Sequence, residues 1–263
     1  KVSCGVRHTA IIVDNNLFTC GWNNKGQLGL GDTTDRNSPT LVPFFNSNVS
    51  SVSCGYLYTA VVGTTGNLFT FGDNSYGQLG LGNTTYYSSP KQIGVLTNWK
   101  YISTGSNHCL AVKTDGTLWA WGNNYQGRLG LNNSTYYSSP KQVGSLTNWL
   151  YVSGAYASSF AIKTDGTMWS WGANLYGSLG VGSTTNYSSP KQIGLLTTWS
   201  KLPATNINYG CSAIKTDGTM WVWGYNNGGK LALGDTVNRS NPTQLGTATN
   251  WLKIANGYND SFF

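Results

Sequence analysis

"KTDGTLWAWG" at residues 113–122 returns as "KTDGTMWSWG" at 163–172 and as "KTDGTMWVWG" at 215–224. Weaker copies are "GTTGNLFTFG" at 63–72 and "VDNNLFTCG" at 13–21. In the three close copies an Asp-Gly pair separates two runs of alternating residues, which is the strongest short-range signal for a β-hairpin. The stretch therefore predicts a hairpin that the chain repeats five times.

The hairpins recur with a period of about fifty residues, and such self-similarity is typical of repeat architectures. The same spacing separates four tryptophans, Trp99, Trp149, Trp199 and Trp251. We predict one domain over residues 1–263, built from five repeats and the start of a sixth. The predicted repeats are 1–50, 51–100, 101–150, 151–200 and 201–252, and the sixth begins at 253–263.

Side chains on the second arm of each hairpin alternate between the two faces of a sheet. Leu118 and Ala120 point to one face and Trp119 and Trp121 to the other, so both faces are apolar and both must be covered. A radial stack of similar sheets covers them, and no helical periodicity competes. The pattern predicts an all-β fold, a β-propeller with four-stranded blades of about fifty residues. We expect a structural role for the equivalent tryptophans Trp121, Trp171 and Trp223.

Three motifs resemble a known repeat: "CGVRHTAII" at 4–12, "WNNKGQLGLGD" at 22–32 and "SSPKQIG" at 88–94. With the hairpin they make the chain similar, over nearly its whole length, to the regulator of chromosome condensation family. That resemblance implies a ring of about seven blades, of which this chain would supply about five. It also implies, as an alternative function, guanine-nucleotide exchange on a small GTPase or binding to chromatin. No long insertion that could act as an exchange wedge interrupts the repeats.

The composition is poor in charge. Only 10% of the residues are charged, the formal net charge is +7, and no glutamate occurs. Asn, Ser, Thr, Gly and Tyr supply the polarity instead, as is commoner in extracellular β proteins and viral fibres. No apolar run approaches the length of a membrane-spanning helix. We therefore expect an extracellular, cell-surface or virion-associated location and a phage structural or bacterial surface protein.

Catalytic residues are hard to find. His8 and His108 are the only histidines, and they occupy the same position of two repeats, where other repeats have Tyr58 and Ser158. A side chain that recurs in this way is better explained as structural than as catalytic. No nucleophile triad, zinc motif or phosphate-binding loop is present. The sequence predicts no enzyme activity, no metal site and no cofactor.

The lysines follow the repeat as well. Two repeat positions are shared by lysines, the first by Lys91, Lys141 and Lys191 and the second by Lys113, Lys163 and Lys215. Radial repetition spreads such charges around a rim, whereas a nucleic-acid interface gathers them on one face. We expect these lysines to be solvated and predict no nucleic-acid partner.

One surface feature favours binding. "TTYYSSP" at 84–90 and "STYYSSP" at 134–140 place tyrosine pairs in equivalent loops, and adjacent blades would align them as an aromatic strip. Tyrosine suits interfaces because it offers a large contact area at low entropic cost. A second reading, left open, is that one ring of each pair packs under its own loop. The candidate binding residues are Tyr86, Tyr87, Tyr136, Tyr137 and Tyr187.

The expected function is a non-enzymatic scaffold whose loops bind a macromolecular partner, either a protein or a glycan. A glycan-binding propeller is a further alternative, and it would need exposed aromatic rings beside Asn or Asp side chains.

Overall fold

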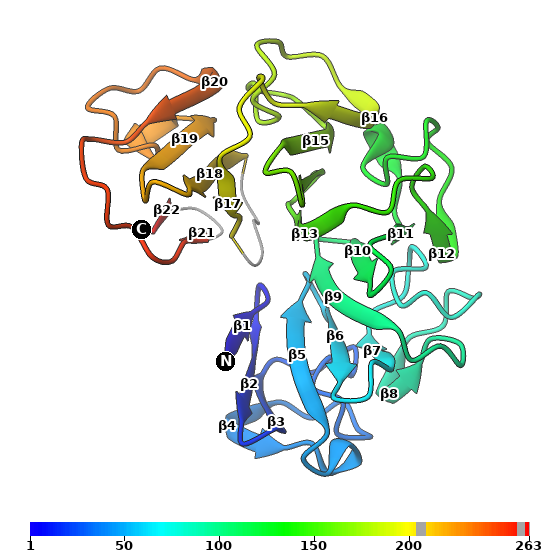
Figure 1. Ribbon diagram of the computed structural model, residues 1–263. Helices are drawn as coiled ribbons and strands as arrows, with labels where there is room; N and C mark the ends of the chain where they lie inside the picture. Colours follow the sequence, from blue (N-terminus) through cyan, green and yellow to red (C-terminus); the bar gives the residue numbers. More distant parts are fainter. Residues whose placement is uncertain (204–208, 257–260, 263) are drawn as a thin grey trace.

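A computed structural model of the chain describes residues 1–203, 209–256 and 261–262. Its strands form five antiparallel four-stranded sheets, and each sheet takes its strands in chain order as an up-and-down meander. Figure 1 shows the sheets as blades of an open arc, from the blue first blade to the orange fifth. The predicted all-β propeller fold is confirmed.

The strands have the following bounds. Blade 1 contains β1 (Val2–Cys4), β2 (His8–Val13), β3 (Asn16–Gly21) and β4 (Arg36–Leu41). Blade 2 contains β5 (Val49–Cys54), β6 (Tyr58–Gly63), β7 (Leu68–Gly72) and β8 (Tyr87–Gln92). Blade 3 contains β9 (Trp99–Thr104), β10 (His108–Lys113), β11 (Leu118–Gly122) and β12 (Tyr137–Gln142).

Blade 4 contains β13 (Trp149–Gly154), β14 (Ser158–Lys163), β15 (Met168–Gly172) and β16 (Tyr187–Gln192). Blade 5 contains β17 (Trp199–Lys201), β18 (Gly210–Lys215), β19 (Met220–Gly224) and β20 (Arg239–Gln244). A two-stranded sheet of β21 (Ala255–Asn256) and β22 (Ser261–Phe262) follows. The short 3-10 helices are η1 (Pro43–Phe45), η2 (Tyr125–Gly127) and η3 (Asn227–Gly229). The first strand of every blade lies next to the centre of the arc and the fourth at its rim (Figure 1).

The repeated Asp-Gly pair lies at a hairpin tip. In blade 3 it joins β10 to β11, whose last pair is Val112 with Leu118. Gly116 has a φ of +77°, and a Cβ there would come within 2.0 Å of the Thr147 carbonyl oxygen. The Asp115 carboxylate accepts hydrogen bonds from the N–H and the hydroxyl of Thr117, at 2.9 and 2.6 Å. Glycine is required here for both conformation and space.

A tryptophan closes the junction between neighbouring blades. Trp121 of blade 3 is fully buried, and its Nε1 donates to the carbonyl oxygen of Gln78 in blade 2 at 3.0 Å. Its ring lies on Gly80, where a Cβ would be 2.7 Å from Nε1. Trp171 and Trp223 repeat this arrangement at the next two junctions. Burying each indole contributes about 4–6 kcal/mol as an upper limit.

Hydroxyl groups join the inner strands of neighbouring blades. Ser3 Oγ accepts from the N–H of Cys54 at 2.9 Å, and Ser53 Oγ accepts from the N–H of Thr104 at 3.0 Å. Ser103 Oγ accepts from the N–H of Gly154, also at 3.0 Å. Each bond links residues 51 positions apart. In blades 1 to 3 one serine therefore bonds to the backbone of the next inner strand, whereas Ser153 Oγ, at the equivalent position of blade 4, has no partner among the described residues.

The lysines at the ends of β10, β14 and β18 are not solvated, so that expectation was wrong. Lys113 is only 5% exposed, and its Nζ lies 3.8 Å from the Trp119 ring centroid and 4.7 Å from that of Trp99. Lys163 and Lys215 repeat this arrangement in the next two blades. An ammonium over an indole face is favourable because the ring quadrupole attracts it. The sequence alone does not reveal this contact, because the lysine and the two rings come from three separate strands.

Candidate functional site

The two ends of each blade form two different surfaces, because successive strands of a meander run in opposite directions. One surface carries the turn between the first two strands and the long loop between the last two. We call it the tyrosine face. The other carries the hairpin tips and the connections to the next blade, and we call it the hairpin face. The long loops of the tyrosine face contain the tyrosine pairs singled out in the sequence.

A fully buried asparagine anchors each long loop. In blade 2, Asn74 Nδ2 donates to the carbonyl oxygens of Asn83 and Thr85, at 3.0 and 2.8 Å. Its Oδ1 accepts from the N–H of Leu79 at 2.9 Å. Equivalent bonds are made by Asn23, Asn124, Asn174 and Asn226. The loop backbone is thereby fixed by its buried base, which leaves the side chains at its tip free to vary.

One tip position differs between blades. In blades 1, 4 and 5 it holds Asp35, Asn186 and Asn238, whose Oδ1 atoms each accept the backbone N–H of the anchoring asparagine at 2.8 Å. In blades 2 and 3 the same position holds Tyr86 and Tyr136. Among the described contacts, no side chain replaces the lost bond to the N–H of Asn74 or Asn124. Blades 2 and 3 thus lack this hydrogen bond and have a surface tyrosine at the same position.

The members of each tyrosine pair lie in different environments. Tyr86 and Tyr136 are 54% and 45% exposed. The Tyr86 ring is 5.1 Å from Lys25 Nζ of blade 1, and the Tyr136 ring packs edge-on against Tyr76 of blade 2, with centroids 6.0 Å apart. Each exposed ring contacts a loop of the preceding blade, and the structure records no contact between Tyr86 and Tyr136 themselves.

The second tyrosines are half-buried on their own loops. The hydroxyls of Tyr87 and Tyr137 accept from Asn83 Nδ2 and Asn133 Nδ2, at 3.2 and 3.3 Å. Lysine Nζ atoms lie 5.4, 5.5 and 5.3 Å from the rings of the equivalent residues Tyr87, Tyr137 and Tyr187. These three side chains pack against their own blade, so their part in binding stays a prediction.

The sequence analysis missed a larger aromatic group on the same face. Tyr176 packs against Tyr209 and Tyr225, with ring centroids 5.6 and 4.3 Å apart, and Tyr156 packs against Tyr209 at 5.4 Å. Tyr125 is 59% exposed. Tyr176, like Tyr76, directly precedes the positive-φ glycine of its long loop, and this repeated tyrosine was an available signal.

Arg128 lies beneath these rings. It is only 6% exposed, its Nε donates to the carbonyl oxygen of Tyr125 at 3.0 Å, and Nη1 reaches that of Tyr156 at 3.5 Å. Burial lowers the pKa of Arg128, although nearby tyrosines act in the opposite direction. Both ion pairs in the described residues, Arg36 with Asp32 and Arg239 with Asp235, lie elsewhere. Arg128 is therefore a buried cation to which no described acidic side chain is paired.

The two histidines bridge blades. His8 Nε2 lies 3.0 Å from Thr59 Oγ1, and His108 Nε2 lies 3.0 Å from Ser159 Oγ. Both hydroxyls donate onward to backbone carbonyls, so each must accept the proton of Nε2–H. Burial lowers the pKa of His8 to about 4, opposed weakly by the Tyr58 backbone, and lowers that of His108 well below 6.5. Both rings are neutral at pH 7, and no carboxylate in the described residues bonds to either.

The described parts of the chain contain neither a metal-binding cluster nor a membrane-spanning helix. No group of three or more His, Cys, Asp or Glu side chains is arranged to hold a metal ion. No helix there has the length and apolarity needed to cross a bilayer.

Relatives of known role match parts of the chain. The human X-linked retinitis pigmentosa GTPase regulator is 40% identical over 94 residues, which is 35% of this chain and 9% of the relative. The ultraviolet-B receptor UVR8 of Arabidopsis thaliana is 39% identical over 99 residues, or 37% and 22%. Human protein RCC2 is 42% identical over 93 residues, or 35% and 18%. The matches thus cover less than a quarter of each relative.

Solved structures share the fold. Yeast RCC1 (Prp20), bound to Kap60, superposes with a TM-score of 0.83 at 20% identity, over 98% of this chain and 65% of the other. Human WBSCR16 gives 0.82 at 23% identity, over 94% and 66%. A second structure of Prp20p, from Saccharomyces cerevisiae, gives 0.82 at 18% identity, over 94% and 63%, and its binding to Gsp1p and histones is described. The chain thus spans about two-thirds of these propellers.

The expected extracellular, cell-surface or virion-associated location was wrong. The sequence relatives include a GTPase regulator and an ultraviolet-B receptor, and yeast Prp20, which shares the fold, is described as binding Kap60, Gsp1p and histones. These findings also give no support to a phage structural or bacterial surface protein. The low charge and the absence of glutamate misled the analysis because a blade surface made of Asn, Thr and Tyr can face any aqueous compartment.

The Regulator of chromosome condensation (RCC1) repeat matches five consecutive segments, 14–62, 65–112, 115–162, 165–212 and 217–263. Each segment begins at or next to a hairpin tip, so one repeat takes the outer strands of one blade and the inner strands of the next. The matched residues make up most of the chain and include the glycines and tryptophans of the blade junctions. The chain therefore belongs to the regulator of chromosome condensation repeat family.

Proposed function

We propose that the chain is a non-catalytic propeller that binds a protein partner through its tyrosine face. The observation that carries this proposal is the substitution at one loop tip, where Tyr86 and Tyr136 replace the hydrogen-bonding Asp or Asn of the other blades. A neutral hydrogen bond contributes about 0.5–1.5 kcal/mol. Where a repeat protein departs from its own stabilising pattern on the surface, function is the usual reason.

The surrounding side chains support a protein partner. Interfaces are enriched in Tyr and Arg and depleted in Lys, Glu and Asp at their centre. Tyr125 and Tyr136 lie close to Arg128, and Arg128 has no acidic partner in the described residues. This charge beneath the tyrosine rings favours a partner that carries acidic side chains, because complementary potentials steer association. The buried asparagines keep the loops rigid, so little entropy would be lost on binding.

The proposal treats residues 1–263 as one binding domain, because hydrogen bonds cross each junction between neighbouring blades. The partners reported for solved relatives, a Gsp1p-type GTPase and histones, are the first to test. One sequence relative is a GTPase regulator, which favours the GTPase over histones as the partner. It likewise favours the alternative function of nucleotide exchange.

The test measures affinity by biolayer interferometry, with the chain immobilised and the GTPase or core histones in solution. We expect one of them to bind and the Tyr86→Ala, Tyr136→Ala double variant to bind at least about 30-fold more weakly, the range of an interface hot spot. The matched control is Val95→Ala, Leu195→Ala, which alters two strongly exposed side chains on the hairpin face.

Equal affinity for wild type and the tyrosine variant would show that the tyrosine face is not the interface. Binding of neither protein would end the regulator-type proposal. Nucleotide release from the bound GTPase, measured in the same samples, decides between simple binding and exchange.

A further inference from the structure

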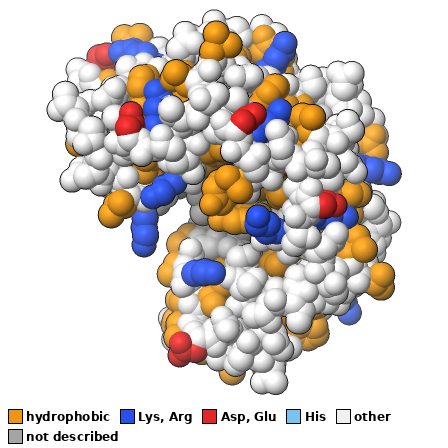
Figure 2. Space-filling view, in the orientation of Figure 1, with side chains coloured by type: hydrophobic (Ala, Val, Ile, Leu, Met, Phe, Trp, Pro, Cys, Tyr) orange, Lys and Arg blue, Asp and Glu red, His pale blue; other side chains and the backbone are white. Residues whose placement is uncertain are grey.

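The first strands of the five blades surround a central cavity of about 680 Å³, lined also by residues 252–254. This volume lies within the range of small-molecule sites. Figure 2 shows blue basic and orange apolar side chains bordering the notch at the centre of the arc, with the red acidic groups farther out. The cavity is separate from the tyrosine face, and the proposed function does not use it.

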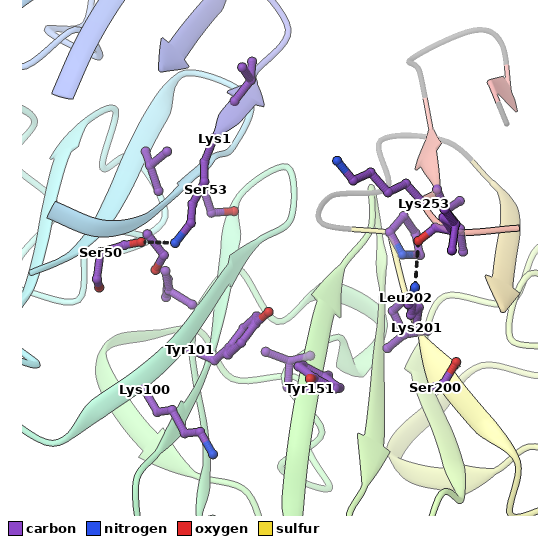
Figure 3. A pocket seen from close by; sticks show the side chains of 18 residues that line it. Lys1, Ser50, Ser53, Lys100, Tyr101, Tyr151, Ser200, Lys201, Leu202 and Lys253 are labelled. Atoms are coloured by element: carbon purple, nitrogen blue, oxygen red, sulfur yellow. Dashed lines mark hydrogen bonds between the residues drawn. The ribbon is translucent and has the colours of Figure 1, made fainter. Parts of the chain in front are cut away.

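One repeat position dominates the wall of this cavity. It is the residue two places after the inner-strand tryptophan, which gives Tyr101, Tyr151, Lys201 and Lys253. Ser51 holds the position in blade 2. Lys1 holds it in blade 1, since "KVSC" at 1–4 corresponds to "SVSC" at 51–54. Figure 3 shows Lys1 on one side of the space, Lys201 and Lys253 on the other, and the two tyrosines between them.

The charge in the cavity is all of one sign. Its lining contains four lysines, Lys1, Lys100, Lys201 and Lys253, and no acidic residue. Lys100 and Lys253 make no hydrogen bond or ion pair with the described residues. Lysines gathered around one open space make its potential positive, which attracts anions.

Two of these lysines are held in place. Lys1 Nζ donates to the Ser50 carbonyl oxygen at 2.6 Å, and Lys201 Nζ donates to that of Leu252 at 2.7 Å. Ser50 lies in the first strand of blade 2, and Leu252 follows the last strand of blade 5. An ammonium has three N–H donors, so each lysine keeps two for another acceptor. The anchors orient the side chains without neutralising them.

The remaining wall is aromatic and rich in hydroxyls. Tyr101 and Tyr151 pack edge to face, with ring centroids 5.2 Å apart. Burial, together with Tyr151, raises the pKa of Tyr101, so its phenol stays neutral and can donate a hydrogen bond at pH 7. Four serines also line the cavity, and of these only Ser51 has a hydroxyl without a hydrogen-bond partner among the described residues.

We propose that this cavity binds a compact small molecule that carries several phosphate groups. Ammonium groups bind phosphate as point charges, and the phenol groups of Tyr101 and Tyr151 can donate to its remaining oxygens. An extended acidic peptide brings about one charge per 3.3 Å, so only a few of its carboxylates would fit. Several phosphates on one ring place more charge within the same volume.

The probe is inositol hexakisphosphate, titrated into the purified chain by calorimetry at 150 mM salt. We expect one molecule to bind per chain, and the Lys201→Gln, Lys253→Gln variant to bind at least tenfold more weakly. The control is Lys91→Gln, Lys141→Gln, which removes the same net charge from outer strands and should bind like wild type. Lys253→Gln alone provides a variant that removes no described hydrogen bond, in case loss of the Lys201 anchor disturbs folding.

Absence of binding would overturn the proposal. Equal weakening by the two double variants would also overturn it, because it would show that the probe responds to net charge and not to the cavity. Tighter binding of a hexaglutamate peptide than of the inositol phosphate would overturn the ligand class. The melting temperature should rise with probe concentration in wild type and much less in Lys253→Gln.

Discussion

Gly130 and Gly144 allow the packing of a blade junction to be separated from backbone strain. Both have positive φ, +75° and +63°. A Cβ on Gly130 would lie 2.8 Å from Trp171 Nε1 and 3.1 Å from two further ring atoms, whereas a Cβ on Gly144 would meet nothing within 4 Å. Both alanine substitutions therefore strain the backbone to a similar degree, but only Gly130→Ala also disturbs the packing of a side chain.

The expected magnitudes follow from these contacts. Holding alanine in the left-handed region costs about 1–2 kcal/mol, so the free energy of unfolding of both variants should fall by this amount. Gly130→Ala must also displace a fully buried indole, and overpacking costs about 1–3 kcal/mol more. The displaced ring would strain the 3.0 Å bond from Trp171 Nε1 to the Arg128 carbonyl oxygen as well. We expect Gly144→Ala to lose about 1–2 kcal/mol and Gly130→Ala about 2–5.

The assay is urea unfolding followed by tryptophan fluorescence and by circular dichroism, with the free energy extrapolated to water. Ala232 occupies the equivalent position of blade 5 at a φ of +55°, so alanine can adopt this backbone. Equal losses in the two variants would refute the claim that the tryptophan on the glycine fixes the junction.

Three further predictions follow from the hydrogen bonds and pKa values. Tyr86→Asn should restore the bond to the Asn74 N–H, stabilising the fold by about 0.5–1.5 kcal/mol while weakening partner binding, and a loss of stability would contradict this. Asn124→Ala should cost about 2–4 kcal/mol, because it leaves buried backbone groups of the loop unpaired, and an unchanged urea midpoint would contradict it. Because the folded pKa of His8 is about 4, the unfolded chain binds more protons between pH 6.5 and 4, so stability should fall as the pH falls through this range, by up to about 3 kcal/mol for His8. His108, whose pKa is also lowered by burial, should act in the same direction. The His8→Gln, His108→Gln variant should lack that slope, and an identical slope would assign the effect to other groups.

Much of the fold could be predicted from local patterns. Alternation around Asp115-Gly116 identified the hairpin, and the two apolar faces of the strand holding Trp119 and Trp121 implied stacked sheets. Long-range chemistry could not be read in this way. The pairing of Lys113 with Trp99 and Trp119 needs three strands to be placed, so the lysine was taken for a solvated one.

The candidate site was predicted only in part. The repeated "YY" indicated Tyr86 and Tyr136, whereas no sequence pattern singled out Arg128. Its burial depends on how the loops of two blades meet. The cavity lysines were not predicted, because Lys201 and Lys253 occupy a repeat position that holds tyrosine in blades 3 and 4. The lysines that do recur at one repeat position lie elsewhere in the blades.

The serine bond from one inner strand to the next has a consequence for folding. It recognises a partner strand 51 residues away, and blades 3 and 4 are so similar that a strand one blade farther along offers nearly the same surface. During refolding a blade can therefore dock on the wrong neighbour, with almost every local contact satisfied, and form a trap that must reopen before the native order is reached. Residues that differ between repeats, such as Phe71 in place of tryptophan and Ala232 in place of glycine, make the blade junctions distinguishable and so favour the native order of blades.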